Sequence, residues 1–311
     1  MAIDSTQAEV IQAIIGWAEA RPAIRCVLLT STRAIPGNPV DALSDYDLIL
    51  VVDDIHPFVS NHSWLDDFGH VLVAYWDPIY HDQTYGMEVC ANVVQYQHGL
   101  KIDFTLWPVS LMRCIVKEPH LPTELEAGYR VLVDKDHLTR AMLPPAGTAY
   151  IPRRPSREEF DRLVNDFLSD APYVAKCLWR EELLPAKWCL DYDMKHIYLR
   201  PMLEWLVETK HGWSLPVGNL GRGLKKYLPV GIWKALEGSY AGVVISDNWQ
   251  ALARTMVLFH EVAQEVGHQL GYAYPVELHE GVGAYIERIR QLDKPGIDEN
   301  KSVSQTSGRG S

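Results

Sequence analysis

Two aspartates, Asp45 and Asp47, lie at the start of an apolar run at residues 48–52. The run predicts a β-strand, in which side chains at i and i+2 point the same way, so the two residues stand about 7 Å apart at Cα. Like charges this close repel each other, and an apolar environment raises the cost. A divalent cation bound through oxygen ligands removes the conflict. The pair therefore indicates a metal site, although a lone D-x-D pair also fits a turn cap or a solvent-facing position.

A third aspartate, Asp103, lies inside a later apolar segment, between Ile102 and Phe104. Aspartate is disfavoured within a strand, so its presence there needs a physical reason. If the strand at 101–107 pairs with the strand that carries Asp47, the three carboxylates converge. Such a trio can hold two Mg²⁺ ions, which would bridge the phosphates of a nucleoside triphosphate and stabilise charge at the attacked phosphorus. The alternative is an Asp103 that faces outward from a half-exposed edge strand.

A hydroxyl-rich segment, Thr30 to Arg33, follows the first apolar strand at 24–29. Ser31 and Thr32 would offer hydroxyls and backbone N–H groups to the terminal phosphates, and Arg33 would add a positive charge. Together with the metal site, this loop predicts a reaction in which a substrate hydroxyl attacks the α-phosphate and pyrophosphate leaves.

The spacing of apolar residues predicts the elements that must position these groups. A helix at 5–20, with Ser5 or Thr6 as its N-cap, precedes the first strand, which is almost wholly apolar and therefore central in its sheet. Residues 97–99 form a hairpin turn. The other expected elements of this half are a short helix at 64–68 and strands at 71–76, 87–96, 101–107 and 129–133, the last at a sheet edge.

The pattern changes beyond a segment rich in proline and glycine at 141–156, which has the composition of a linker. Helical spacing then predominates, and Pro172 is a candidate break between the first two stretches. The helical stretches are 160–168, 173–179, 190–207, 249–270 and 276–289. We therefore expect the α+β class: a mixed-sheet domain at 1–145, a helical domain at 156–292 and a disordered polar tail at 293–311.

The composition limits the classes of function. The chain has 29 Lys or Arg and 40 Asp or Glu, and its net charge of −11 disfavours binding to nucleic acid and suits a cationic small molecule better. Five cysteines without C-x-x-C spacing predict free thiols in a reducing compartment. Neither a signal peptide nor an apolar run of membrane-spanning length is visible. We expect a cytoplasmic protein that does not bind a membrane, with a monomer favoured.

Several segments of the chain, taken together, resemble one known family. They are Leu28–Arg33, Ser44–Asp47, Val51–Asp54, Trp64–Gly69, Lys101–Leu106, Tyr173–Leu183, Ala186–Lys187 and Met202–Trp205. The sequence resembles the aminoglycoside 6-adenylyltransferases, the streptomycin-modifying branch of the nucleotidyltransferases, from Ile24 to Ile289. The resemblance implies a nucleotidyltransferase sheet of the DNA polymerase beta type, Mg²⁺, ATP as cosubstrate, and transfer of AMP to a hydroxyl of streptomycin or a related aminoglycoside, which confers antibiotic resistance.

The resemblance and the expected geometry together suggest roles for the acidic residues. Asp45 and Asp47 hold the metals, and Asp103 either completes the metal site or accepts the proton of the attacking hydroxyl. A carboxylate beside cations has a lowered pKa, which favours the ligand role. Glu181 and Glu182 are then candidates for the catalytic base, although both also fit ordinary helix-surface charge.

Two lysines of the second half, Lys176 and Lys187, are candidates for contacting the triphosphate. They are eleven residues apart, about three helical turns, so they share a face if one helix contains both. Pro185 argues against a continuous helix, and lysines are usually solvated.

One position departs from the family. Ser31 stands where the family has glycine, and its Cβ hinders the close approach of a phosphate to the backbone. Two alternatives therefore stay open beside the leading one. The chain could be a catalytically weak or dead nucleotidyltransferase fold that binds a ligand, or a nucleotidyltransferase with another hydroxyl acceptor.

Overall fold

The computed structural model describes residues 7–35, 37 and 40–293 of the 311-residue chain. It divides into two compact units, Met1–Tyr150 and Ile151–Ser311, and the boundary falls within the proline-rich segment at 141–156. The expected N-cap at Ser5 or Thr6 and nearly all of the expected disordered tail lie outside the described residues. The α+β class is confirmed, with a mixed sheet in the first unit and helices in the second.

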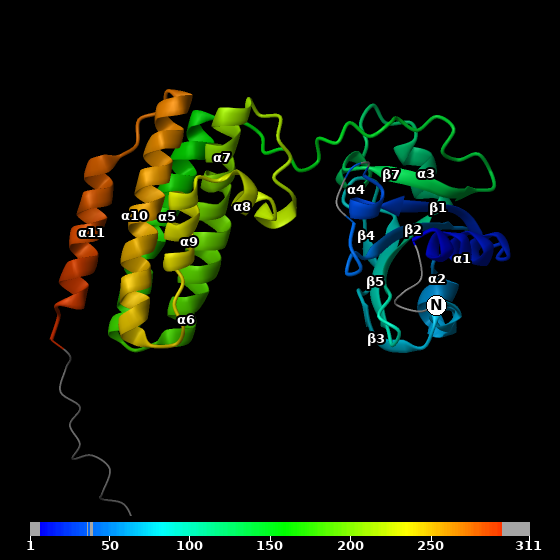
Figure 1. The fold of residues 1–311 in the computed structure, drawn as a ribbon, viewed down its shortest axis with the longest axis horizontal. Coiled ribbons are helices and arrows are strands. Elements are labelled where there is room, and N and C mark those ends of the chain that lie inside the picture. Colours follow the sequence, from blue (N-terminus) through cyan, green and yellow to red (C-terminus); the bar gives the residue numbers. More distant parts are fainter. Residues whose placement is uncertain (1–6, 36, 38–39, 294–311) are drawn as a thin grey trace, which may run out of the picture. The chain divides into compact units, whose positions relative to one another are not determined.

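A single mixed sheet organises the described part of the N-terminal unit (Figure 1). Its strands are β1 (Ile24–Thr30), β2 (Tyr46–Val52), β3 (Val71–Trp76), β4 (Tyr80–His81), β5 (Glu88–Tyr96), β6 (Lys101–Pro108) and β7 (Tyr129–Asp134). The order is β3-β5-β6-β2-β1-β7, and β4 pairs with β5. Strands β2 and β6 are parallel, and the other pairs are antiparallel. The expected strands are thus confirmed, including β1 in the interior and β7 at an edge.

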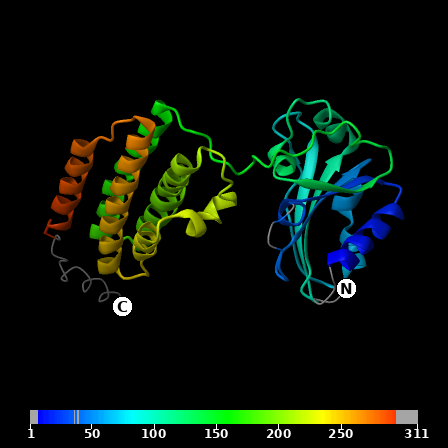
Figure 2. The ribbon, with the colours of Figure 1, turned by 45° about the horizontal axis from the view of Figure 1, so that its top comes forward.

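Strand β2 is buried on both faces, which explains why its sequence is continuously apolar. Leu48 and Leu50 belong to a core that also contains residues of α1 (Gln7–Glu19). Ile49 and Val51 belong to a second core, which contains residues of α3 (Val109–Ile115). Figure 2 shows α1 lying along one side of the sheet.

Short helical elements complete this unit. They are η1 (Ser31–Arg33), α2 (His56–Ser60), η2 (His62–Phe68) and α4 (Thr123–Glu126). The 3₁₀ segment η2 confirms the short helix expected at 64–68. The hairpin turn expected at 97–99 is also present, with the N–H of Gly99 bonded to the carbonyl of Tyr96 at 2.9 Å.

The second unit is helical in its described residues. Its elements are α5 (Arg157–Trp179), α6 (Leu183–Lys187), η3 (Trp188–Leu199), α7 (Arg200–His211), η4 (Asn219–Gly221), α8 (Leu224–Tyr227), α9 (Val230–Gly238), α10 (Ile245–Leu270) and α11 (Val276–Arg290). Helix α5 begins with a capping box between Ser156 and Glu159, and it continues through Pro172. The break considered at Pro172 is therefore wrong. Long helices α5, α7 and α10 run side by side (Figure 1).

Segment η3 is a π-helix, which the apolar spacing of the sequence does not predict. It buries the charged end of Lys195, whose Nζ lies 2.6 Å from Oδ1 of Asp191 and 4.3 Å from the ring centre of Tyr240. The other carboxylate oxygen of Asp191 binds Nζ of Lys187 at 2.5 Å. One aspartate thus compensates two lysines, one of them fully buried. None of the helices in the described residues has the length and apolarity needed to span a bilayer.

A pair of histidines packs between α10 and α11. The ring centres of His260 and His279 are 4.5 Å apart, and the hydroxyl of Tyr274 lies 2.9 Å from Nδ1 of His279. Burial, and then the neighbouring His260, lower the pKa of His279 to about 4. The folded protein therefore favours the neutral imidazole.

We predict that this histidine makes the helical unit sensitive to acid. The pKa of an unfolded histidine is about 6.5, so the stability from neutral His279 is complete above that pH and is lost as the pH falls towards about 4. In His279→Gln, the drop in urea midpoint between pH 7 and pH 4.5 should be smaller than in the wild type. The exposed His268 on α10 supplies the control His268→Gln, which should keep the wild-type drop. An unchanged drop in His279→Gln would contradict the assignment.

Candidate active site

The parallel pairing of β2 with β6 brings two of the predicted carboxylates together. Asp47 lies directly opposite Asp103 in the register of these strands. Asp45 precedes β2 by one residue, on the side of the chain that Asp47 shares. The expectation that the strand of Asp103 lies beside that of Asp47 is confirmed, and the edge-strand alternative is wrong because β6 lies between β5 and β2.

Lys101 joins two of these carboxylates. Its Nζ lies 2.5 Å from Oδ2 of Asp45 and 3.1 Å from Oδ2 of Asp103. No role was expected for Lys101, although it lies two residues before Asp103 in the same strand and therefore points to the same face. That spacing is the signal that could have identified it. Its ammonium group supplies the positive charge that this cluster of like charges needs.

The two central carboxylates are unfavourable as anions in the protein alone. Burial raises the pKa of Asp47, and the charges of Asp103 and Asp45 raise it further. Burial also raises the pKa of Asp103, against the opposing effect of Lys101. Oδ1 of Asp103 is buried and has no hydrogen-bond partner among the described residues. Oxygen donors, excess negative charge and an unpaired buried oxygen fit a divalent cation such as Mg²⁺.

The loop after β1 approaches the same carboxylates. Thr30 lies opposite Asp47 in the register, and its hydroxyl donates to the carbonyl oxygen of Asp47 at 3.3 Å. Ser31 donates a side-chain hydrogen bond to the carboxylate of Asp47, which lowers its pKa and partly offsets burial. Ser31 has a φ of 59°, in the left-handed region that favours glycine. The serine thus adopts a backbone conformation that is typical of glycine. Thr32 lies half-buried in the same turn.

Arg33 holds the chain that leads into β2. Its guanidinium donates to the carbonyl oxygens of Ser44, at 2.7 Å, and Asp45, at 3.0 Å. It also lies 4.0 Å from the ring centre of Tyr46. These contacts fix the backbone on which Asp45 stands. The predicted contact between Arg33 and a phosphate stays a prediction.

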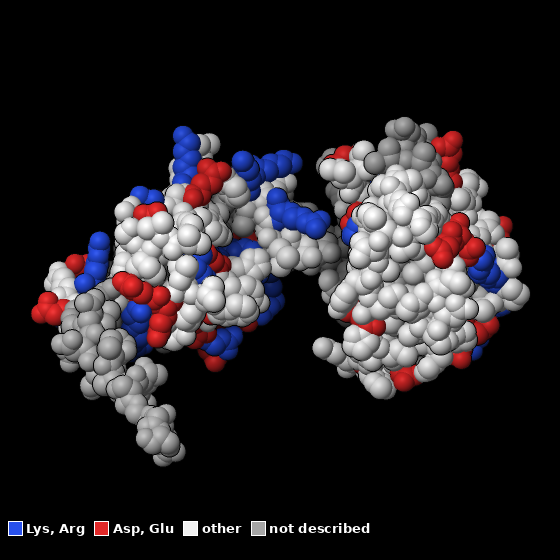
Figure 3. Space-filling model, turned by 90° about the horizontal axis from the view of Figure 1, so that it is seen from below, with Lys and Arg blue, Asp and Glu red and all other residues white. Residues whose placement is uncertain are grey.

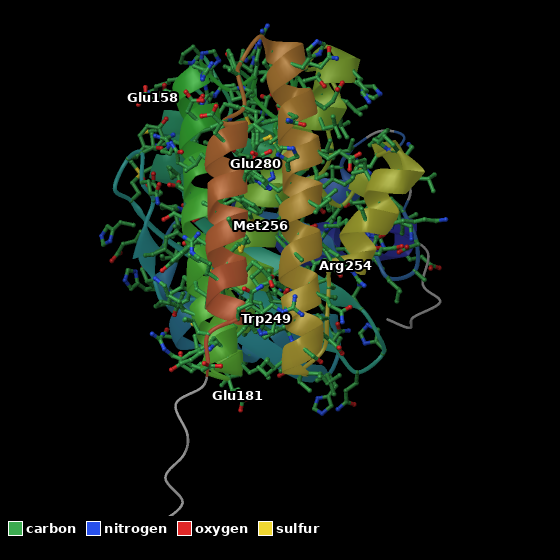
Figure 4. All side chains as sticks on the ribbon, turned by 90° about the vertical axis from the view of Figure 1, so that its left-hand side faces the viewer. Glu158, Glu181, Trp249, Arg254, Met256 and Glu280 are labelled. Atoms are coloured by element: carbon green, nitrogen blue, oxygen red, sulfur yellow. The ribbon has the colours of Figure 1, made fainter. Side chains whose placement is uncertain are left out.

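The remaining predicted site residues lie in the helical unit, around the end of α5. Figure 4 shows Glu181 at the end of α5 opposite to Glu158. Glu181 lies in the turn between α5 and α6, with a φ of 59°, and Glu182 follows it there. Roles for these two glutamates as catalytic bases stay predictions.

The two candidate lysines belong to different helices. Lys176 lies in α5 and Lys187 at the end of α6, so the shared face of one continuous helix does not exist. Nζ of Lys187 donates to the carbonyl oxygen of Ala241 at 2.7 Å and pairs with Asp191. Nζ of Lys176 lies 5.8 Å from the ring centre of Tyr285. Contacts from either lysine to a triphosphate stay predictions.

A second group with metal-ligand chemistry lies within the helical unit. Asp170, Cys189 and Asp193 each place one donor atom within 4.8 Å of the others. Burial raises the pKa of Asp170, and Asp193 raises it further. Acidic groups often cluster without a metal, and the hydroxyl of Tyr198 already bonds to Asp170.

On the face of the helical unit seen in Figure 3, acidic and basic side chains are interspersed.

Comparison with known proteins defines the class. The chain is a nucleotidyltransferase enzyme. The sequence profile of the streptomycin adenylyltransferases matches residues 5–289, and the chain belongs to that family.

Relatives of known name cover nearly the full length. An aminoglycoside 6-adenylyltransferase of Campylobacter jejuni is 31% identical over 308 residues, which cover 95% of this chain and 99% of that protein. Proteins of the same name from Bacillus subtilis (strain 168) and Staphylococcus aureus are 27% and 24% identical, covering 91% and 87% of this chain and 98% and 94% of those proteins. The resemblance read from the sequence motifs is confirmed.

We predict that Ser31 has two opposing effects on the stability of the protein. In Ser31→Ala, the hydroxyl bonded to Asp47 is lost while the left-handed φ still carries a Cβ, which should cost about 1 kcal/mol. In Ser31→Gly, relief of the backbone should offset the lost hydrogen bond, so its stability should lie near that of the wild type. Urea denaturation of the three proteins measures the order. Equal stability of the alanine and glycine variants would contradict the backbone argument.

We also predict that Lys101 competes with a bound cation. In Lys101→Met, the lost ion pairs should lower stability without metal by about 1 kcal/mol. The same change should tighten Mn²⁺ binding severalfold, since the carboxylate oxygens become available and the ammonium charge no longer repels the cation. Calorimetric titration with Mn²⁺ measures the affinity. The exposed Lys117 in the same unit gives the control Lys117→Met, with wild-type affinity expected. Weaker Mn²⁺ binding in Lys101→Met would contradict this competition.

Proposed function

We propose that this protein transfers AMP from ATP to a hydroxyl of streptomycin or a related aminoglycoside and releases pyrophosphate. The observation that carries the proposal is the register of β2 and β6, which sets Asp47 opposite Asp103 with Asp45 next to them. The names of the relatives at up to 31% identity support an aminoglycoside as the acceptor. The modification would confer resistance to the antibiotic.

The proposed reaction is a single phosphoryl displacement. The acceptor oxygen forms a bond to the α-phosphorus while the bond from that phosphorus to the bridging oxygen breaks, and pyrophosphate leaves with the bonding electrons. Mg²⁺, held by Asp45, Asp47 and Asp103, would stabilise the charge on the phosphate oxygens. The turn at Ser31 and Thr32 would orient the terminal phosphates through hydroxyl and N–H groups. Most of the acceleration would come from positioning.

The proton of the acceptor hydroxyl must pass to a base. Asp103 is one candidate in the alternative where it accepts this proton in place of completing the metal site, since burial raises its pKa in the protein without metal. Glu181 and Glu182 are the candidates from the helical unit. Lys176 and Lys187 are candidates for charge stabilisation of the leaving pyrophosphate.

The chemistry of the chain agrees with this acceptor class. Aminoglycosides are cationic, and a net charge of −11 favours their approach. We propose a cytoplasmic monomer that uses cellular ATP and does not act on nucleic acid.

A second candidate is a ligand-binding protein with the same fold and little turnover. The observation that favours it is Ser31, whose Cβ stands at a left-handed position where the family has glycine. It predicts that calorimetry detects binding of ATP or streptomycin while no pyrophosphate forms.

We predict that streptomycin incubated with the protein, ATP and Mg²⁺ gains, in mass spectrometry, the mass of an adenylyl group, which is AMP less one water. Omission of any one component should abolish the product. Asp45→Asn and Asp103→Asn should each lower kcat by about a hundredfold or more, since the charge that holds the cation is reduced.

Asp53 provides a matched control. It follows the far end of β2 and is exposed, so Asp53→Asn should keep wild-type kcat. Retained turnover in Asp45→Asn or Asp103→Asn would exclude the carboxylate mechanism. If only another acceptor in a panel with labelled ATP is modified, the streptomycin assignment fails while the class of reaction stands.

A further inference from the structure

The sheet face that carries the carboxylates continues beyond them towards the β3 edge. Asp103 on β6 lies opposite Val93 on β5, and Val93 lies opposite Tyr75 on β3. Directly opposite residues of neighbouring antiparallel strands point to the same face. Val93 and Tyr75 therefore extend the row of Asp47 and Asp103 sideways, at about 5 Å and about 10 Å from β6 by the strand spacing.

A second row runs beside the first. Lys101 lies opposite Gln95 on β5, and Gln95 lies opposite Val73 on β3. Val73 and Tyr75 are each 60% exposed, and Val93 is 36% exposed. We call these three side chains, Val73, Tyr75 and Val93, the apolar shelf. It is a small exposed surface that is continuous with the carboxylate site.

The apolar shelf and the loop after β1 lie on opposite sides of the carboxylates. In the order β3-β5-β6-β2-β1-β7, the carboxylates stand on β2 and β6. The turn at Ser31 follows β1, on the far side of β2. The shelf lies on β5 and β3, on the far side of β6. Figure 1 shows β3 and β5 in the part of the sheet away from β1.

This arrangement indicates from which side of the carboxylates the acceptor approaches. In phosphoryl transfer the attacking and leaving oxygens are roughly in line across the phosphorus. In the reaction proposed above, pyrophosphate leaves towards the turn at Ser31. The acceptor oxygen must then approach the α-phosphorus from the side of β5 and β3, where the apolar shelf lies.

We infer that the apolar shelf binds the aminoglycoside acceptor, with the ring of Tyr75 against a sugar ring or a cationic group. This inference rests on the proposed function and adds the place where the acceptor binds in the N-terminal unit. An aromatic face attracts cations and packs well against apolar ring surface. The hydroxyl of Tyr75 is hydrogen-bonded to the carboxylate of Asp77, which fixes the ring and places a negative charge next to it. That pairing complements a polycationic acceptor better than it does a neutral nucleobase.

Steady-state kinetics of Tyr75→Ala and Tyr75→Phe test this inference. The alanine variant should raise KM for streptomycin about five- to tenfold, the effect of one cation–π or stacking contact, and leave KM for ATP unchanged. The phenylalanine variant keeps the ring and should lie close to the wild type. Val131→Ala is the control, because Val131 is 42% exposed on β7 at the opposite edge of the sheet. Calorimetric titration with streptomycin alone should show the same loss for Tyr75→Ala only.

The possible outcomes distinguish failure of the apolar shelf as the acceptor site from failure of the proposed reaction. If the wild type adenylylates streptomycin and Tyr75→Ala has the same KM for streptomycin as the wild type, the apolar shelf is not the acceptor site, and the proposed function stands. A rise in KM for ATP alone assigns the shelf to the nucleotide and also overturns the inference. A wild type that adenylylates no aminoglycoside overturns both. Melting temperatures of all variants identify any that fail to fold, in which case Val93→Ala, judged by the same split of KM values, replaces Tyr75→Ala.

Discussion

Repulsion among three carboxylates is the constraint on which the site depends. Asp45, Asp47 and Asp103 are held close by backbone pairing that they do not themselves favour, and burial raises the pKa of the last two. The protein compensates with one ammonium group, from Lys101, and with one hydroxyl donor, from Ser31. The hydroxyl is neutral and one ammonium charge does not neutralise three anions, so the cluster keeps an excess of negative charge. A site of this kind favours cations over any neutral ligand.

The packing of β2 is what forces the carboxylates into this place. Leu48 and Leu50 are buried in one core, while Ile49 and Val51 are buried in the other. A slip of one residue would exchange the two faces of the strand and put Asp47 into the core beneath α1. The apolar residues thus set the register, and the register sets Asp47 opposite Asp103. Stability of the two cores is therefore what offsets the unfavourable cluster of charges.

Much of the N-terminal unit follows from local pattern. The apolar strands and the hairpin turn at Gly99 were predictable from periodicity and turn residues, and the importance of Asp103 from its improbable position in a strand. The convergence of Asp47 with Asp103 depends on the pairing of β6 with β2, which local pattern does not determine. The role of Lys101 was not predicted, since lysines usually face solvent, although its spacing to Asp103 places both side chains on one face of the strand.

The helical unit contains features that the periodicity of apolar residues does not predict. Pro172 is tolerated within α5, and Trp188–Leu199 forms a π-helix, because tertiary packing around these residues outweighs local propensity. Periodicity of apolar residues identifies a helix but does not distinguish a π-helix from an α-helix. The ion pair of Lys195 with Asp191 joins residues four apart, a spacing that an α-helix also brings together, so the sequence indicates the pair but not the burial of Lys195.

The hydrogen bond from Ser31 to Asp47 offsets the backbone cost of a serine at this position. A residue other than glycine at a φ of 59° carries a cost of about 1 kcal/mol or more. The hydroxyl of Ser31 returns a similar amount by donating to Asp47, a carboxylate that burial makes unfavourable. A glycine at this position would avoid the backbone cost and would also lack the hydrogen bond to Asp47. The substitution therefore alters how the carboxylate is stabilised, and it is compatible with a site that still binds cations. For this reason an unusual residue in the loop is a weaker argument for a dead enzyme than the intact carboxylate register is for an active one.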